Sequence, residues 1–140
     1  MTDLTLNLEA TIHAPIETVF DAWLDPQTLA RFMLPQPGMP RPEVENEPRV
    51  GGRFEILMRH GDDLLPHKGE YLVIDRPKRL RFSWQSHYSP DDSTVTLDFT
   101  ALDAQTTRIA LTQVRFLNEE ACEAHRGGWS NILAALGELL

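Results

Sequence analysis

The sequence predicts an α+β domain in which one antiparallel sheet carries its helices on a single face. Apolar and polar residues alternate with a period of two in several segments, which is typical of half-buried strands. The connections between these segments are short, so neighbouring strands must run antiparallel. The C-terminal segment instead carries one apolar stripe at helical spacing. Strands gathered together with helices on one side define the α+β class.

The N-terminal part predicts a strand followed by two short helices. Residues 4–12 alternate between apolar and polar side chains, which favours a strand. Apolar residues at helical spacing predict a helix over 15–24 and a second one over 25–33. Asp25 and Pro26 have the residue types that cap a helix and occupy its first position.

Residues 35–48 hold five of the ten prolines of the chain. Proline removes a backbone donor and fixes φ, so we predict an irregular loop with neither a strand nor a helix in it. Two interpretations stay open, because a long irregular segment is either a plain connector or the wall or lid of a binding site.

The rest of the chain predicts five more strands and one long helix. The strands are expected at residues 54–58, 69–75, 80–85, 94–101 and 107–116. Asn118 is a suitable N-cap for the helix, which runs to the C-terminus. Gly127 and Gly128 lie in its middle and cost about 2 kcal/mol relative to two alanines. We therefore expect a side chain or a ligand to need that space.

Composition limits the classes of function. The 140 residues suit a single domain, residues 1–140, with 41% hydrophobic and 24% charged residues. A net charge of −8 argues against nucleic acid and anionic membranes as partners. No apolar run is long enough to span a membrane, and the acidic N-terminus does not resemble a signal peptide. We therefore expect a cytoplasmic protein.

Motifs for catalysis, metals and cofactors are missing from the sequence. Cys122 is the single cysteine, so a disulfide or a cysteine-rich zinc site cannot form within the chain. The five histidines show no paired ligand spacing, and no nucleophile elbow or phosphate loop is present. We predict no catalytic residue, no metal and no cofactor.

The final helix and the predicted sheet suggest a pocket. His125 and Trp129 lie one turn apart on the stripe that must face the sheet. Tyr71 and Trp84 lie opposite, and each combines an apolar body with a polar group that needs a partner when buried. Such residues can simply pack as core. An apolar cavity with a few polar groups is typical of a small-molecule site.

Short phrases in nearly the whole chain carry a family resemblance. They stand at residues 14–20, 25–26, 50–54, 69–71, 77–80, 82–84 and 125–129. In this order they resemble the START-like helix-grip (SRPBCC) superfamily, and within it the bacterial homologues of the activator of heat-shock-protein-90 ATPase. The resemblance implies a curved seven-stranded antiparallel sheet wrapped around the C-terminal helix, with a cavity for apolar or amphipathic molecules.

We predict that the ligand lies between the sheet and the C-terminal helix. The predicted ligand-binding residues are Phe32, Phe54, Met58, Tyr71, Trp84, Phe99, His125, Trp129 and Leu133. Members of the superfamily share no single catalytic residue, so none is transferred to this chain, and an enzyme is not the favoured interpretation.

Three hypotheses for function follow. The leading one is a protein that binds a hydrophobic small molecule. The second is a co-chaperone-like interaction module, which predicts an exposed apolar patch and a collapsed cavity. The third is a cyclase or hydrolase with His125 or His67 as general base. A homodimer is a further candidate assembly. Direct stimulation of a chaperone ATPase is not expected, since 140 residues leave no room for the extra N-terminal domain of the eukaryotic co-chaperone.

Overall fold

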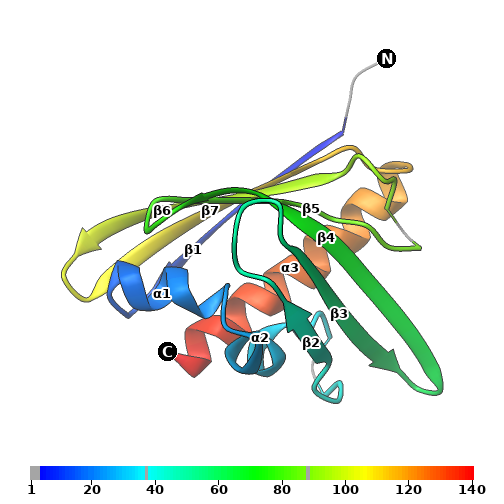
Figure 1. Ribbon diagram of the computed structural model, residues 1–140, viewed down its shortest axis with the longest axis horizontal. Coiled ribbons are helices and arrows are strands. Elements are labelled where there is room, and N and C mark those ends of the chain that lie inside the picture. Colours follow the sequence, from blue (N-terminus) through cyan, green and yellow to red (C-terminus); the bar gives the residue numbers. More distant parts are fainter. Residues whose placement is uncertain (1–3, 37, 88) are drawn as a thin grey trace.

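One curved antiparallel sheet and a long helix across its face make up the protein (Figure 1). The computed structural model describes residues 4–36, 38–87 and 89–140. Residues 1–3, on which part of the targeting prediction rests, and Pro37 of the proline-rich segment lie outside the described residues. The predicted α+β class is confirmed, and the described residues form seven strands, with two short helices after the first strand.

The elements follow one another in a simple order. The strands are β1 (Thr5–Ile12), β2 (Glu43–Asn46), β3 (Arg53–His60), β4 (Asp63–Asp75), β5 (Arg79–Ser83), β6 (Thr94–Asp103) and β7 (Thr106–Val114). The helices are α1 (Ile16–Ala22), α2 (Pro26–Phe32) and α3 (Glu119–Leu139). The sheet order is β1-β7-β6-β5-β4-β3-β2, so β1 and β2 form opposite edges and the segment that contains α1 and α2 connects them.

Both predicted helix caps are present. The Asp25 carboxylate accepts a hydrogen bond from the backbone N–H of Thr28 at 3.1 Å. The Asn118 side-chain oxygen accepts one from the N–H of Ala121 at 2.8 Å. These bonds satisfy backbone donors that the first turn of a helix otherwise leaves open, and so they set where α2 and α3 begin.

The prediction that residues 35–48 contain no strand was wrong. Residues 43–46 form β2, which pairs with β3 in a register that places Val44 opposite Ile56. None of the five prolines lies within these four residues. An edge strand needs hydrogen bonds on one side only, so a short strand can form between the prolines.

Strand β4 begins six residues before the predicted strand 69–75, and Pro66 lies within it. The Lys68 backbone N–H points away from β3, because it donates to the carbonyl of Gln85 on the β5 side. The nitrogen of Pro66, two residues earlier, points to that same side. It lies before the part of β4 that pairs with β5, so no bond of that ladder is lost.

The core lies between the sheet and the helices. The predicted stripe of α3 is buried at Cys122, Trp129, Ile132, Leu133 and Leu136. Beneath α2, the Trp23 and Phe32 rings meet edge to face with centroids 5.0 Å apart. Trp23 also lies 6.5 Å from Trp129 of α3, so the short helices and the long helix share one core.

Candidate functional site

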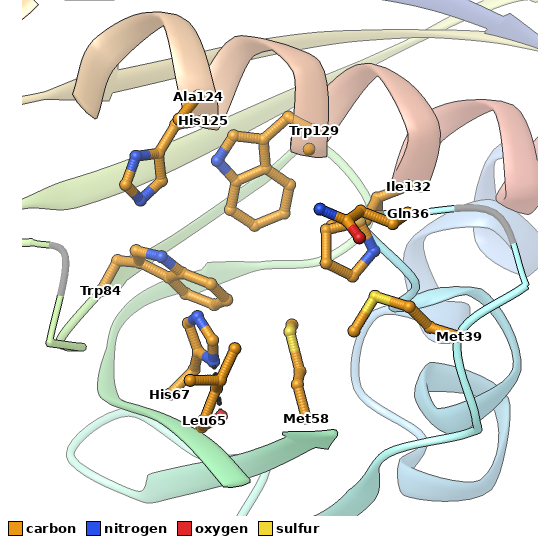
Figure 2. Close-up of a pocket in the computed structure, with 12 residues that line it drawn as sticks. Gln36, Met39, Met58, Leu65, His67, Trp84, Ala124, His125, Trp129 and Ile132 are labelled. Carbon is orange, nitrogen blue, oxygen red and sulfur yellow. Dashed lines mark hydrogen bonds between the residues drawn. The ribbon is translucent and has the colours of Figure 1, made fainter. Parts of the chain in front are cut away.

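A pocket of about 340 Å³ lies between the N-terminal half of α3, the sheet and the proline-rich segment (Figure 2). Strands β3 and β4 provide one wall, and α3 provides the opposite wall. Its lining residues are Pro35, Gln36, Met39, Met58, Leu65, His67, Trp84, Ala124, His125, Gly128, Trp129 and Ile132. Most of them are apolar, as in pockets that bind small molecules.

The nine predicted ligand-binding residues do not come together in one place. Four of them line the pocket, namely Met58, Trp84, His125 and Trp129. Phe54 and Tyr71 line a separate space under α2 of about 20 Å³, a volume no larger than about one water molecule needs.

Three more predicted residues also lie away from the pocket. Phe32, the last residue of α2, is fully buried, and Phe99 packs against Phe20 with ring centroids 5.0 Å apart. Leu133 lines a groove between α3 and β1. These three side chains contribute to the core or to another surface, and they do not line the 340 Å³ pocket.

The polar group of Tyr71 already has a partner inside the protein. Its hydroxyl oxygen accepts a hydrogen bond from Asn46 Nδ2 at 3.0 Å, and the same amide donates to the Leu24 carbonyl at 2.8 Å. Burial raises the pKa of Tyr71. The Tyr71 hydroxyl therefore joins β4 to β2, and the Asn46 amide joins β2 to the segment between α1 and α2. Both bonds stabilise the fold beside the pocket.

A buried polar network fixes the indole of Trp129. Its Nε1–H donates to Gln113 Oε1 at 2.7 Å, and Gln113 Nε2 donates to Ser93 Oγ at 3.0 Å. The Ser93 hydroxyl in turn donates to the Val114 carbonyl at 2.9 Å. Trp84 lies against Trp129 with ring centroids 4.9 Å apart. A fully bonded network keeps this aromatic wall in one orientation.

The proline-rich segment forms one wall of the pocket at Pro35, Gln36 and Met39. The Pro35 carbonyl accepts a hydrogen bond from Asn131 Nδ2 of α3 at 2.8 Å. A Cβ at Gly128 would lie 3.3 Å from the Pro35 Cβ, so this glycine permits the close approach. A Cβ at Gly127 would meet nothing within 4 Å, and nothing in the structure explains that glycine.

His67 presents a hydrogen-bond acceptor. Its Nδ1 lies 3.0 Å from the Leu65 carbonyl, which can only accept, so Nδ1 carries the proton and Nε2 keeps a lone pair. Burial lowers the pKa of His67 to about 4; the nearby His125 also lowers it, and the Leu65 hydrogen bond opposes the shift. The ring is therefore neutral near pH 7.

His125 is held on both sides. Its Nδ1 donates to the Ala121 carbonyl at 2.7 Å, so its Nε2 accepts a hydrogen bond from the Ser89 hydroxyl at 3.0 Å. Burial lowers the pKa of His125. Of the two pocket histidines, only His67 has an Nε2 without a partner among the described residues.

The indole N–H of Trp84 is buried without a hydrogen-bond partner in the described part of the chain. Residues 4–36, 38–87 and 89–140 contain no group of three side chains suited to a metal ion. None of their helices is both long and apolar enough to cross a membrane.

Several pocket residues were missed by the sequence analysis: Pro35, Gln36, Met39, Leu65, Ala124 and Ile132 were not predicted ligand-binding residues, and His67 was considered only as a general base. For three of them, Leu65, His67 and Ile132, a signal existed. Leu65 and His67 continue the period of two that leads to Gly69 and Tyr71 in β4. Ala124 and Ile132 lie on α3, and Ile132 is on the apolar stripe that faces the sheet. Pro35, Gln36 and Met39 instead depend on how the irregular segment folds back, which periodicity does not report.

A curved sheet around one long helix, with a pocket between them, defines a helix-grip domain. A family model for Activator of Hsp90 ATPase homolog 1-like proteins matches residues 13–140, and the chain belongs to that family. No curated protein matches the sequence significantly.

Solved structures share this fold over nearly the whole chain. A protein from Chromobacterium violaceum is 26% identical, with a TM-score of 0.79 and coverage of 96% of each chain. An AHSA1-like protein from Aeromonas hydrophila is 23% identical, with a TM-score of 0.80 and coverage of 96% of this chain and 90% of that one. An Hsp90 activator from Plasmodium falciparum is 22% identical, with a TM-score of 0.78 and coverage of 97% and 95%.

Proposed function

We propose that this protein binds a small apolar molecule in the pocket between α3, the sheet and the proline-rich segment. The observation that carries the proposal is the open volume of about 340 Å³, which falls within the range of ligand sites. Two tryptophans and two methionines supply polarizable apolar surface, and the neutral His67 supplies a polar contact.

The interaction-module hypothesis predicts a filled cavity and one exposed apolar patch. The large exposed hydrophobic side chains lie in several segments of the described chain, and two of these segments are neighbours, because the Gly51 N–H donates to the Tyr71 carbonyl at 2.9 Å. These side chains are Val50, Leu64, Leu72, Leu102 and Leu117. The likeness to the Plasmodium Hsp90 activator is one of fold, so it does not by itself favour a chaperone partner over a ligand.

The Ser89–His125 hydrogen bond has the form of a nucleophile and its base, which is the one observation that favours an enzyme. Ser89 is buried and does not line the pocket. The bond is therefore better explained as one that holds the His125 ring against α3.

The two adjacent glycines of α3 provide a matched test. Gly128→Leu places a side chain beside Pro35 at the pocket, whereas Gly127→Leu places the same side chain in open space. Native mass spectrometry and a thermal-shift screen of apolar compounds would compare both variants with the parent protein. We expect ligands that bind the parent and Gly127→Leu, and at least about tenfold weaker binding to Gly128→Leu.

Two results would overturn the proposal. One is a screen in which no compound binds the parent protein. The other is equal binding to both leucine variants, because the ligand would then occupy a different part of the molecule.

A further inference from the structure

No Asp, Glu, Lys or Arg side chain lines the pocket. The chain has 21 acidic and 13 basic residues, yet none of them is among the pocket-lining residues. The two lining histidines are neutral near pH 7, since burial lowers the pKa of each. A charged ligand group would lose its hydration there without gaining a counter-charge, which is unfavourable.

Besides the exposed Gln36 and the buried N–H of Trp84, the pocket has a hydrogen-bond acceptor at His67. His67 is 9% exposed, and its ring lies between Leu65 and Trp84 (Figure 2). Its Nδ1 proton is committed to the Leu65 carbonyl at 3.0 Å, which leaves the Nε2 lone pair without a partner among the described residues. The corresponding atom of His125 already accepts from Ser89.

Taking the proposed function as given, we propose that the pocket selects neutral ligands that bring a hydrogen-bond donor, such as an aromatic hydroxyl, to His67 Nε2. A carboxylate or an ether presents only lone pairs to this nitrogen, so it leaves the acceptor unsatisfied. A carboxylate also brings an unpaired charge into an apolar site.

The volume indicates the size of the ligand. A cavity of about 150 Å³ accommodates benzene, so about 340 Å³ suits a molecule of roughly two rings. Trp84 and Trp129, 4.9 Å apart, offer aromatic surface for such rings. Naphthalene derivatives are therefore suitable probes.

Isothermal titration at pH 7 would compare 2-naphthol, 2-methoxynaphthalene and 2-naphthoate on the parent protein. We expect 2-naphthol to bind about tenfold more tightly than 2-methoxynaphthalene. The carboxylate should bind more weakly than either. This series uses only the unaltered chain, so it does not depend on the folding of any variant.

The variant His67→Phe tests whether the preference for 2-naphthol depends on His67 Nε2. The variant keeps an aromatic ring beside Trp84 and removes the lone pair, so the tenfold preference for 2-naphthol should fall to about twofold or less. Binding of 2-methoxynaphthalene should stay close to that of the parent. His13→Phe makes the same change at an exposed position and should leave the preference intact.

The possible failures are distinguishable. Equal binding of the naphthol and its methyl ether, or a naphthol preference that survives in His67→Phe, would overturn the donor selection and leave the pocket as a ligand site. If none of the probes binds, both this proposal and the proposed function are overturned for ligands of this size.

Discussion

Two regions of the molecule share one sheet and one long helix but differ in what covers them. Helix α2 covers the first region, and the proline-rich segment covers the second. Beneath α2, Trp23, Leu29 and Met33 fill the space down to about 20 Å³. Beside Pro35 and Met39, about 340 Å³ stays open. In this molecule the segment between β1 and β2 therefore decides where the core is closed and where it forms a pocket.

The largest expected effect separates the two regions by stability. Phe32→Ala removes a fully buried ring under α2 and should lower the free energy of unfolding by about 3–5 kcal/mol. Met39→Ala removes a half-buried side chain at the pocket and should cost less than about 1 kcal/mol. Urea denaturation of both variants measures the difference, and similar losses would mean that the pocket wall is packed as tightly as the core.

A pH effect should arise on the pocket side. The pKa of His67 falls from an ordinary 6.5 to about 4 on folding, so the unfolded chain binds more protons between these values. The stability from the neutral ring is therefore complete above pH 6.5 and is lost as the pH falls towards 4. The loss should reach about 2–3 kcal/mol, and the lowered pKa of His125 acts in the same direction.

Urea denaturation at pH 7, 5.5 and 4 would isolate this effect. The free energy of unfolding of the parent should decrease relative to that of His67→Phe as the pH falls, because only the parent has the titrating ring. A difference that is constant across these pH values would mean that His67 titrates normally in the folded protein.

A smaller effect concerns Trp129, which contacts both regions. Gln113→Leu leaves the buried Trp129 N–H without an acceptor and should lower the free energy of unfolding by about 1–3 kcal/mol. Adding Trp129→Phe removes that unpaired donor, so the double variant should lose less than the sum of the single losses. Additive losses in this double-mutant cycle would show that the bond contributes little.

The sequence predicts the elements far better than the pocket. Alternation and the caps Asp25 and Asn118 locate the helices and most strands, because these signals are local. Strand β2 is not predicted because four residues between prolines are too few to show a clear alternation of apolar and polar side chains. The early part of β4 is not predicted because a proline usually interrupts a strand. Pro66 is tolerated here because its nitrogen, which has no hydrogen to donate, faces away from β3.

Some predicted ligand-binding residues line the pocket and others do not, for a related reason. Spacing on α3 identifies which side chains face the sheet, and so it finds His125 and Trp129. It does not report that α2 fills the space in front of Phe54 and Tyr71. Spacing also does not report that Asn46 donates a hydrogen bond to the Tyr71 hydroxyl, because Asn46 is distant from Tyr71 in the chain.

The attachment of Pro35 to α3 has a consequence for divergence among such domains. Asn131 holds the Pro35 carbonyl and Gly128 gives the ring room, so the chain is fastened at one point before it rims the opening. Insertions or replacements between this point and β2 should reshape the entrance with little effect on the packed interior. Changes in this segment can therefore alter the entrance of the pocket at little risk to folding, because Pro35 stays attached to α3.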